Sequence, residues 1–269
     1  MKNAASFMDG LSLHHYSIAP NWTEKERAAE FSEKTWYELL RNASFMETLV
    51  SRHDEIMTKY DPEKRIALVV DEWGTWHEVE KDTNPGFLYQ QNTVRDALVA
   101  GITLNIFNNH SDRVKIANIA QAVNVLQSPV LTEGNKMIKT PTWYVFHSYK
   151  AHMDATLLKS KVATGTVGVA DDAKLDAITA SASRKDDVYT ITLTNADLNK
   201  ARSVNLVLDN FKGSIKSASA VVIAGENMNS MNTFDNPNQV VEKDLSVKTE
   251  GNAVLVEMPA RSLVTITVK

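Results

Sequence analysis

The chain of 269 residues has no cysteine, which excludes a disulfide framework, a thiolate nucleophile and any metal site built on cysteine. It also has no excess of basic residues. The net charge is −4, so the composition offers no electrostatic basis for binding nucleic acid or an anionic membrane. No apolar run approaches the length of about 18 residues that spans a bilayer. The hydrophobic fraction of 43% and the charged fraction of 23% are those of an ordinary globular protein.

The amino terminus lacks the apolar segment of a secretory signal peptide. An apolar stretch, Leu11-Ser12-Leu13, begins almost at once, and we therefore expect the chain to enter a domain midway. A signal peptide would then belong to a preceding segment. The sequence assigns no compartment beyond a cytoplasmic default.

The most informative stretch is residues 66–76. Ile66 to Val70 form an apolar, β-branched run, the pattern of a strand buried on both faces of a parallel sheet. The run stops at Asp71 and Glu72, and two tryptophans follow, Trp73 and Trp76. Catalytic side chains gather at the carboxyl ends of such strands, and a carboxylate among aromatic rings suits a carbohydrate ligand. The competing interpretation is that the two acids only begin a solvated loop.

The first half of the chain alternates strands and helices. A capping-box spacing between Thr23 and Glu26 marks the start of the helical region, and Asp61-Pro62 marks its end. Gly101 is interpreted as a helix C-cap. The predicted elements, in order, are strand 10–16, helices 23–60, strand 66–70, helix 93–100, strand 102–107 and helix 112–126. This order is typical of βαβ units, whose strands are parallel.

The pattern changes after residue 128. Residues 129–137 predict a hairpin, and the aromatic-rich residues 141–153 predict a short helix between two bodies. Short alternating strands then follow, of which residues 188–194 are the clearest, and they indicate an antiparallel β-sandwich. We therefore divide the chain into residues 1–128 with parallel strands, a connector over residues 129–156 and a sandwich over residues 157–269.

Polar residues follow each of the three predicted parallel strands. These groups are His14-His15-Tyr16, Asp71-Glu72 and Asn108-Asn109-His110. Parallel strands present their carboxyl ends at one rim, so we expect these groups to converge at a site for glycoside hydrolysis. A metal site of His14, Glu72 and His110 is the rival, but the sequence has no HExxH pattern, and we assign no metal and no cofactor.

The second carboxylate that glycoside hydrolysis requires is not evident. Asp71 neighbours Glu72, but adjacent residues of a strand point to opposite faces and would not flank one bond. Glu78, Glu80 and Glu133 do not lie at predicted strand ends.

Four stretches closely resemble the α-L-arabinofuranosidases of glycoside hydrolase family 51. They are Asp9-Gly10-Leu11-Ser12-Leu13-His14-His15-Tyr16, Asp71-Glu72-Trp73-Gly74-Thr75-Trp76, residues 112–126 with their Ala-Gln-Ala-Val-Asn-Val run, and the ending at residues 258–265. Their order and spacing agree with that family over nearly the whole chain. The resemblance implies the C-terminal part of a (β/α)₈ TIM barrel, with strands six to eight in residues 1–128, followed by a jelly-roll-like β-sandwich.

The resemblance also implies roles for individual residues. Glu72 matches the catalytic nucleophile at the end of the seventh strand, and His14 and Tyr16 match residues that line the sugar pocket at the end of the sixth. Trp76 matches an aromatic wall of that pocket, and Gln121 matches a glutamine that contacts the sugar. The implied reaction removes terminal arabinofuranosyl residues from arabinan or arabinoxylan with retention of configuration.

The departure from the family is large. Its members are about twice as long and carry a general acid in an Asn-Glu pair of the fourth strand, which this chain lacks. We therefore expect the chain to be inactive alone, with an N-terminal barrel half and an arabinose-containing saccharide as partners. Homo-oligomer formation stays open. The alternatives are a non-catalytic carbohydrate-binding or oligomerisation module dominated by the sandwich, and a related enzyme acting on xylosides or β-glucans.

Overall fold

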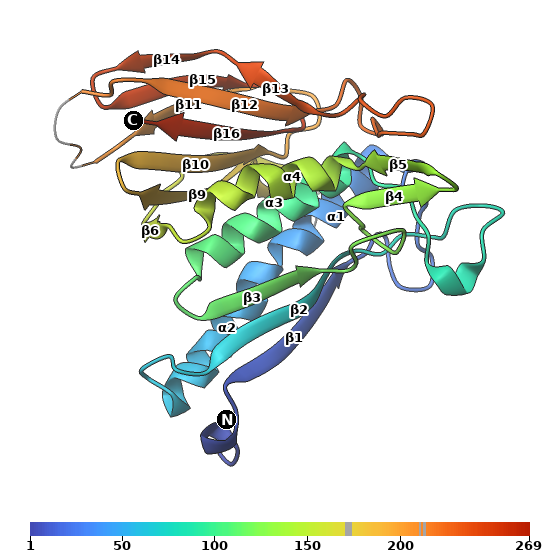
Figure 1. The fold of residues 1–269 in the computed structure, drawn as a ribbon, viewed down its shortest axis with the longest axis horizontal. Coiled ribbons are helices and arrows are strands. Elements are labelled where there is room, and N and C mark those ends of the chain that lie inside the picture. The colour runs from blue at the N-terminus through green and yellow to red at the C-terminus, as the bar shows by residue number, and fades with distance from the viewer. Residues whose placement is uncertain (170–173, 210, 212–213) are drawn as a thin grey trace.

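The computed structural model describes residues 1–169, 174–209, 211 and 214–269. A three-stranded parallel sheet lies at one side, a β-sandwich lies at the other, and helices fill the space between them (Figure 1). None of the described helices combines the length and the apolar character that a membrane span requires.

The parallel sheet consists of β1 (Gly10–Ser17), β2 (Ala67–Thr75) and β3 (Val114–Ile119), with β2 in the middle. Three helices lie on the sandwich side of this sheet, namely α1 (Glu33–Ser44), α2 (Met46–Tyr60) and α3 (Val94–Asn109) (Figure 1). Leu68, Val70 and Trp73 of β2 are buried in the same apolar cluster as residues of all three helices. The predicted alternation of parallel strands and helices is therefore confirmed, except for the helix predicted after the third strand.

The start of the helical region was predicted wrongly. Helix α1 begins after the N-cap Ser32, which forms a capping box with Thr35. Thr23 lies instead in a turn, where the side chain of Asn21 accepts hydrogen bonds from the backbone amide and the hydroxyl of Thr23. A local side-chain turn competes with helix initiation for the same backbone groups, and here it prevails.

The predicted strand 102–107 and the predicted helix 112–126 are also wrong. Helix α3 continues through Gly101 to Asn109, and the third strand, β3, lies within the stretch predicted as helix. Gly101 is a site of close approach, because a Cβ there would clash with Leu263 and Thr194 of the sandwich. Helix α3 is packed on several sides, so its buried residues, among them Ile102, Ile106 and Phe107, are not confined to one face of the helix.

The second half forms a sandwich of two antiparallel sheets, as predicted. One sheet has the order β13-β12-β16-β10-β9-β6 and the other the order β11-β15-β14. Ile191, Val256 and Ile266 belong to the apolar core of this part. The strands are β6 (Thr156–Leu158), β9 (Ile178–Lys185), β10 (Val188–Asn195), β11 (Arg202–Val207), β12 (Ala218–Ala224), β13 (Glu242–Leu245), β14 (Val247–Glu250), β15 (Ala253–Met258) and β16 (Ser262–Val268).

The connector and the smaller elements complete the fold. The predicted hairpin is formed by β4 (Val130–Glu133) and β5 (Lys136–Lys139), and the predicted aromatic helix is α4 (Pro141–Tyr149). The remaining elements are the 3₁₀ turns η1 (Ala5–Phe7), η2 (Pro85–Phe87) and η3 (Lys150–His152) and a small pair of strands, β7 (Thr166–Val167) and β8 (Leu175–Asp176).

A polar network joins the two halves. The side-chain oxygen of Asn105 in α3 accepts hydrogen bonds from Tyr149 of α4 at 2.7 Å and from Thr192 of β10 at 2.8 Å. The apolar cluster under the parallel sheet also includes Leu198 and Leu263 from the sandwich half. The sandwich and the helices thus share one core in addition to the core of the sandwich itself.

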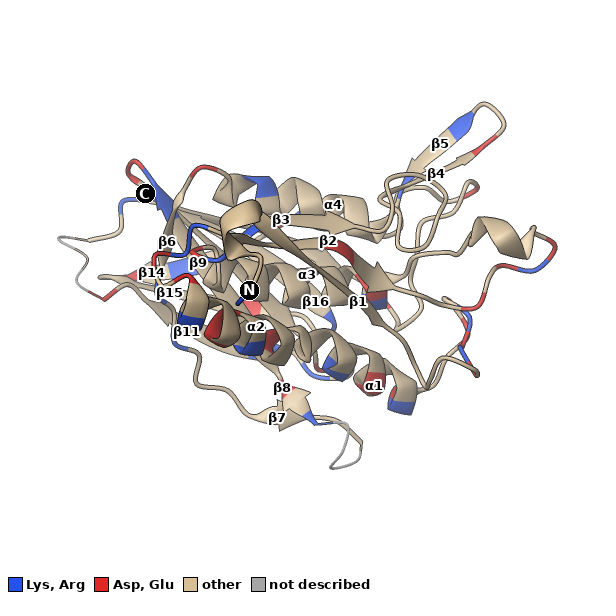
Figure 2. Cartoon of the chain, turned by 90° about the horizontal axis from the view of Figure 1, so that it is seen from below, with Lys and Arg blue, Asp and Glu red and all other residues tan. Residues whose placement is uncertain are grey.

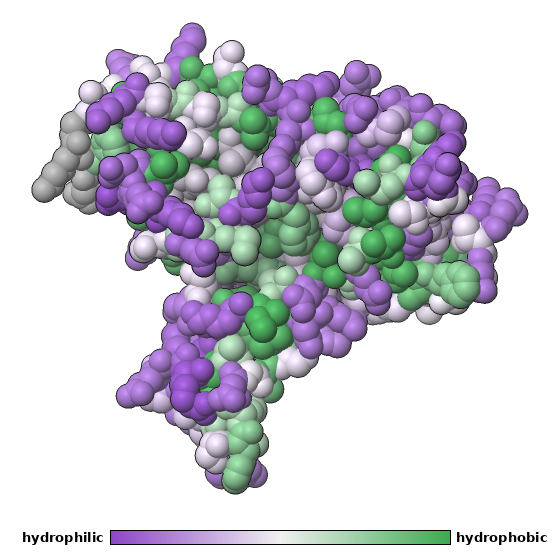
Figure 3. Space-filling model, viewed as in Figure 1, coloured by the Kyte–Doolittle hydropathy of each residue, from purple (hydrophilic) through white to green (hydrophobic). Residues whose placement is uncertain are grey.

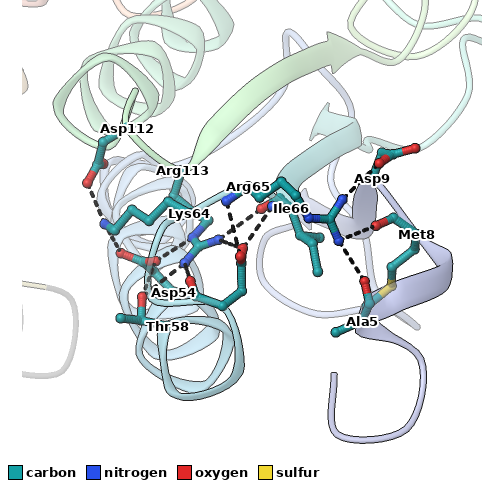
Figure 4. Close-up of polar contacts among 11 residues, drawn as sticks. Ala5, Met8, Asp9, Asp54, Thr58, Lys64, Arg65, Ile66, Asp112 and Arg113 are labelled. Atoms are coloured by element: carbon teal, nitrogen blue, oxygen red, sulfur yellow. Dashed lines mark hydrogen bonds and ion pairs between the residues drawn. The ribbon is translucent and has the colours of Figure 1, made fainter.

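The amino-terminal ends of the parallel strands are held by ion pairs around a buried arginine (Figure 4). Arg113, immediately before β3, donates to Asp54 at 2.6 Å and to Asp61 at 2.8 Å. Lys64 bridges Asp54 and Asp112. The interaction fastens helix α2 to the beginnings of β2 and β3, at the end of the sheet opposite to Glu72.

Candidate active site

The predicted site residues of the first two strands come together at the carboxyl end of the parallel sheet. In the register between β1 and β2, His14 lies beside Glu72 and Tyr16 lies beside Gly74. The acidic pair of β2 forms the only red segment of the parallel sheet in Figure 2, whereas α1 and α2 carry residues of both charges. The sheet thus presents an isolated pair of carboxylates.

The carboxylate of Glu72 is held through one of its oxygens. The hydroxyl of Tyr16 donates a hydrogen bond to Oε2 at 2.8 Å, and Nδ1 of His14 lies 3.6 Å from the same oxygen. Burial and the neighbouring Glu72 carboxylate raise the pKa of Tyr16, so its phenol stays protonated as a donor. Oε1 receives no hydrogen bond from the described residues. The geometry orients the carboxylate and leaves one oxygen free to react.

A β-bulge brings Asp71 to the same histidine. Ser12 pairs with Val69 and His14 pairs with Glu72, so β2 contributes one residue more than β1 over this interval. Nε2 of His14 consequently lies 3.1 Å from Oδ1 of Asp71, while its Nδ1 faces Glu72. The expectation that Asp71 and Glu72 point to opposite faces is therefore wrong, because it assumed regular alternation.

Asp71 is in turn fixed by β1. The hydroxyl of Ser12 donates a hydrogen bond to Oδ1 of Asp71 at 2.6 Å. This hydrogen bond, together with the nearby His14, lowers the pKa of Asp71. Asp71 is thus held as a carboxylate that orients the imidazole of His14 from the side away from Glu72.

Aromatic rings extend from Glu72 toward the surface. The ring of Trp76 meets that of Tyr16 edge to face, with centroids 5.0 Å apart. Trp22, from the loop after β1, lies 5.5 Å from Trp76 and is 59% exposed. The predicted wall residue Trp76 therefore lies next to the predicted pocket residue Tyr16. Trp22 was not predicted as a site residue, although a tryptophan in a loop that follows a site strand is itself a signal.

A buried polar group supports the end of β2. Asp96 at the start of α3 accepts a hydrogen bond from Thr75 at 2.6 Å and lies 2.8 Å from Nε2 of His77. Burial alone would raise the pKa of Asp96, but His77 and the neighbouring donors hold it at about 2. This network was not predicted, because the sequence pattern around Asp96 is that of an ordinary acidic residue in the first turn of a helix.

Gln121 lies just beyond the end of β3. Ile119, the last residue of β3, pairs with Trp73, the residue after Glu72. Gln121 therefore belongs to the same rim as the other site residues, but it lines a separate hollow with the loop after β2. The structure thus brings together His14, Tyr16, Glu72 and Trp76 in direct contacts and places Gln121 beside them.

The third predicted group does not belong to this rim. Asn108, Asn109 and His110 end helix α3, and His110 contacts Glu47 of α2 at 2.7 Å at the opposite end of the sheet. A metal site of His14, Glu72 and His110 is therefore incompatible with the fold. Within the part of the chain that the structure describes, no cluster of three or more His, Asp or Glu residues could hold a metal ion.

Comparison with known proteins agrees with this arrangement. Over 268 residues the chain is 40% identical to an intracellular exo-alpha-L-arabinofuranosidase from Bacteroides ovatus, a match that covers 99% of this chain and 52% of that protein. An intracellular exo-alpha-(1->5)-L-arabinofuranosidase from Halalkalibacterium halodurans is 27% identical over 199 residues, covering 70% of this chain and 39% of that protein. The chain thus spans about half the length of the Bacteroides ovatus protein and a smaller share of the Halalkalibacterium halodurans protein.

Solved structures agree in fold. The structure of the GH51 arabinofuranosidase from Xanthomonas axonopodis pv. citri superposes with a TM-score of 0.96 at 38% identity, covering 100% of this chain and 54% of that one. An arabinose complex of the alpha-L-arabinofuranosidase from Thermotoga maritima superposes with a TM-score of 0.73 at 22% identity, covering 96% of this chain and 52% of that one. At this identity the match supports the fold alone. The predicted fold, a partial barrel followed by a sandwich, is confirmed.

The family model for the alpha-L-arabinofuranosidase C-terminal domain matches residues 71–262, from the acidic pair of β2 to the last strand. The matched range includes Glu72, Trp76 and Gln121. The chain therefore belongs to the alpha-L-arabinofuranosidase C-terminal domain family, as its resemblance to glycoside hydrolase family 51 predicted.

Proposed function

We propose that this chain carries the nucleophile of a retaining α-L-arabinofuranosidase that removes terminal arabinofuranosyl residues from arabinan or arabinoxylan. The observation that carries the proposal is the state of Glu72. Its Oε2 is engaged by Tyr16 and His14, and its Oε1 is free of hydrogen bonds from the described residues. In the first step Oε1 attacks the anomeric carbon, and the bond between that carbon and the leaving oxygen breaks.

The other site residues have supporting roles in this proposal. His14 and Tyr16 orient the carboxylate and line the sugar pocket, Trp76 forms its aromatic wall, and Gln121 contacts the sugar. The fixed geometry of a strand end suits this task, because a nucleophile must be held close to its attack position before the reaction begins.

The general acid is proposed to come from outside this chain. Asp71 also contacts His14, but it accepts a hydrogen bond from Ser12 and faces the ring nitrogen of His14 that points away from Glu72. A retaining enzyme needs its second carboxyl group about 5 Å from the nucleophile, to protonate the leaving oxygen and later activate water. The partner in this proposal is the N-terminal barrel half, which would pair with the edge strands β1 and β3.

An activated substrate tests the nucleophile without the acid. Because 2,4-dinitrophenolate is a good leaving group, 2,4-dinitrophenyl α-L-arabinofuranoside needs no proton at that oxygen. We expect the chain to release close to one equivalent of dinitrophenolate and to accumulate an arabinosyl ester, since no base activates water. Mass spectrometry of the proteolysed protein should place the ester on the peptide that contains Glu72.

Two controls make the experiment decisive. Glu72→Gln should abolish both the release and the ester, and Glu78→Gln in the following loop should leave both unchanged. Addition of the N-terminal half of a family member should convert the single release into turnover. Rapid turnover by the lone chain, or an ester on another residue, would contradict the proposal.

The alternative of a non-catalytic module dominated by the sandwich has less support. The apolar cluster under the parallel sheet includes Leu198 and Leu263 of the sandwich half, and Asn105 of α3 bonds to both β9 and β10. Removal of the barrel part would expose this shared core to water. Limited proteolysis distinguishes the two: a stable fragment that retains Glu72 favours the enzyme, and one confined to the sandwich favours the module.

A further inference from the structure

The imidazole of His14 lies between two carboxylates of β2. Its Nε2 is 3.1 Å from Oδ1 of Asp71, and its Nδ1 is 3.6 Å from Oε2 of Glu72. A neutral imidazole carries one N–H group, so the lone pair of its other nitrogen would face a negatively charged oxygen. An imidazolium carries an N–H group on both nitrogens and places a positive charge between the two negative ones. The geometry therefore favours the charged form of His14.

Asp71 is held as the lasting counter-charge of this imidazole. The hydroxyl of Ser12 donates a hydrogen bond to Oδ1 of Asp71 at 2.6 Å, and this bond, together with the nearby His14, lowers the pKa of Asp71. Ser12 and His14 lie two residues apart on β1 and so point to the same face of the sheet. Asp71 therefore keeps its charge whether Glu72 is a carboxylate or an uncharged ester.

The ionisable groups around Glu72 are few. Among the ion pairs of the described residues, those of Asp71 and Glu72 involve His14 alone. The hydroxyl of Tyr16, 2.8 Å from Oε2 of Glu72, is a neutral donor. The adjacent His15 contacts a backbone carbonyl of α1 instead. Within the described part of the chain, His14 is thus the side chain that pairs a positive charge with Glu72.

We propose that His14 acts as a cation that stabilises Glu72 when it leaves the arabinosyl ester, and that Asp71 is the positioning residue that keeps this cation in place. The inference rests on the proposed function. When a nucleophile attacks the anomeric carbon of the ester, it forms a bond to that carbon. The bond between the carbon and Oε1 of Glu72 breaks, and its electron pair returns to the carboxylate. The returning charge spreads to Oε2, which faces Nδ1 of His14.

The site is open to a small probe. The side chains of His14, Asp71 and Glu72 are 48%, 39% and 47% exposed. In Figure 3 the lower part of the molecule, which includes β1 and β2, shows both hydrophilic and hydrophobic side chains on its surface. Azide is a small anion that needs no base to act as a nucleophile, so it can replace water as the attacking group.

The decay of the ester in azide tests the role of Asp71. The 269-residue chain is esterified with 2,4-dinitrophenyl α-L-arabinofuranoside, sodium azide is added, and mass spectrometry of the intact protein follows the loss of the arabinosyl group. We expect Asp71→Asn to slow the azide-dependent decay about tenfold and Ser12→Ala to slow it about threefold. Asp9→Asn is the matched control and should decay as the wild type does, because Asp9 pairs with Arg65 at the other end of the sheet. Only molecules that formed the ester are followed, so a smaller folded fraction does not itself lower the rate.

Two further measurements separate this role from a structural one. Nitrogen-15 NMR of the imidazole, assigned by comparison with His14→Gln, should show both ring nitrogens protonated up to a higher pH in the wild type than in Asp71→Asn. The affinity for methyl α-L-arabinofuranoside, a methyl glycoside that does not react, should be the same in both proteins. A merely structural role of Asp71 would weaken this affinity and leave the protonation of His14 unchanged.

The possible outcomes separate this inference from the proposed function. Equal decay of the ester in the wild type and in Asp71→Asn would overturn the inference and leave Glu72 as the nucleophile. A slower decay with unchanged protonation of His14 would overturn it as well. The absence of any ester in the wild type would contradict the proposed nucleophile, and with it the role of the cation, even if NMR showed that Asp71 holds the proton of His14.

Discussion

The two ends of the parallel sheet use charged residues in opposite ways. At the amino-terminal end, Arg113 is fully buried and donates five hydrogen bonds, to Asp54, Asp61, Thr58 and the carbonyls of Asp61 and Ile66. At the carboxyl-terminal end, Glu72 is half-exposed, and its Oε1 receives no hydrogen bond from the described residues. A saturated network stabilises a fold, whereas an unsaturated carboxylate is available for chemistry.

The largest expected effect concerns the carboxyl-terminal end. Glu72→Gln removes the proposed nucleophile but keeps the size of the side chain. We therefore expect the rate of dinitrophenolate release to fall about ten-thousandfold. The melting temperature should change little, because Glu72 is only partly buried. If the variant kept most of the release rate, Glu72 would not be the nucleophile.

The amino-terminal end should respond in the opposite way. Arg113→Met leaves Asp61 without its cationic partner and Asp54 with Lys64 alone, and we expect a loss of about 3 kcal/mol in the free energy of unfolding. Urea denaturation followed by circular dichroism measures this loss. Arg65→Met is the control, because Arg65 pairs with the exposed Asp9 and its loss should cost less. Equal losses for the two variants would contradict the structural role given to Arg113.

A smaller effect on chemistry is expected at Tyr16. Tyr16→Phe removes the hydrogen bond to Oε2 of Glu72 and keeps the edge-to-face contact with Trp76. We expect the rate of ester formation to fall about 10- to 100-fold, as for loss of a hydrogen bond to a charged group, with little change in affinity for the methyl glycoside. A purely structural role would instead lower the melting temperature and spare the rate in the remaining folded protein.

The smallest effect is a pH dependence of stability at the amino-terminal end. Hydrogen bonding to Glu47 raises the pKa of His110 above its ordinary value of 6.5. The folded state therefore holds this proton more tightly than the unfolded state. The stabilisation is complete below pH 6.5 and is lost as the pH rises through the raised pKa.

Melting temperatures at pH 5.5 and 8.5 check this expectation. The wild-type chain should lose more stability over this interval than His110→Gln, which cannot titrate. His53→Gln serves as a control, because His53 bonds within its own helix. A pH response that is the same in wild type and His110→Gln would show that the pair does not contribute.

Much of the fold could be read from local sequence. The apolar run before Asp71 predicts β2, the alternation over residues 188–194 predicts β10, and Asp61-Pro62 predicts the end of α2. These features depend on nearby residues alone. Glu72, His14 and Tyr16 were likewise found from the polar ends of strands and from the family resemblance, and the structure places them in contact, although their roles remain proposals.

The position of the third strand could not be predicted from the sequence, because it depends on packing between distant residues. Residues 102–107 form part of a helix because α3 lies between the parallel sheet and the sandwich, and that burial removes the polar face by which a helix is recognised. Gly101 was taken as a helix end, but it is required where Leu263 and Thr194 of the sandwich approach. Contacts between residues so distant in sequence leave no local pattern to read.

The sequence by itself determined the classes of element, the parallel and antiparallel halves and the acidic pair at the end of β2, because periodicity and turn chemistry are local properties. Only the tertiary structure decided how that pair is used. A single extra residue in β2 turns Asp71 and Glu72 toward the two nitrogens of His14. That bulge arises from the register between two strands separated by α1 and α2, and a register between distant strands is set by packing.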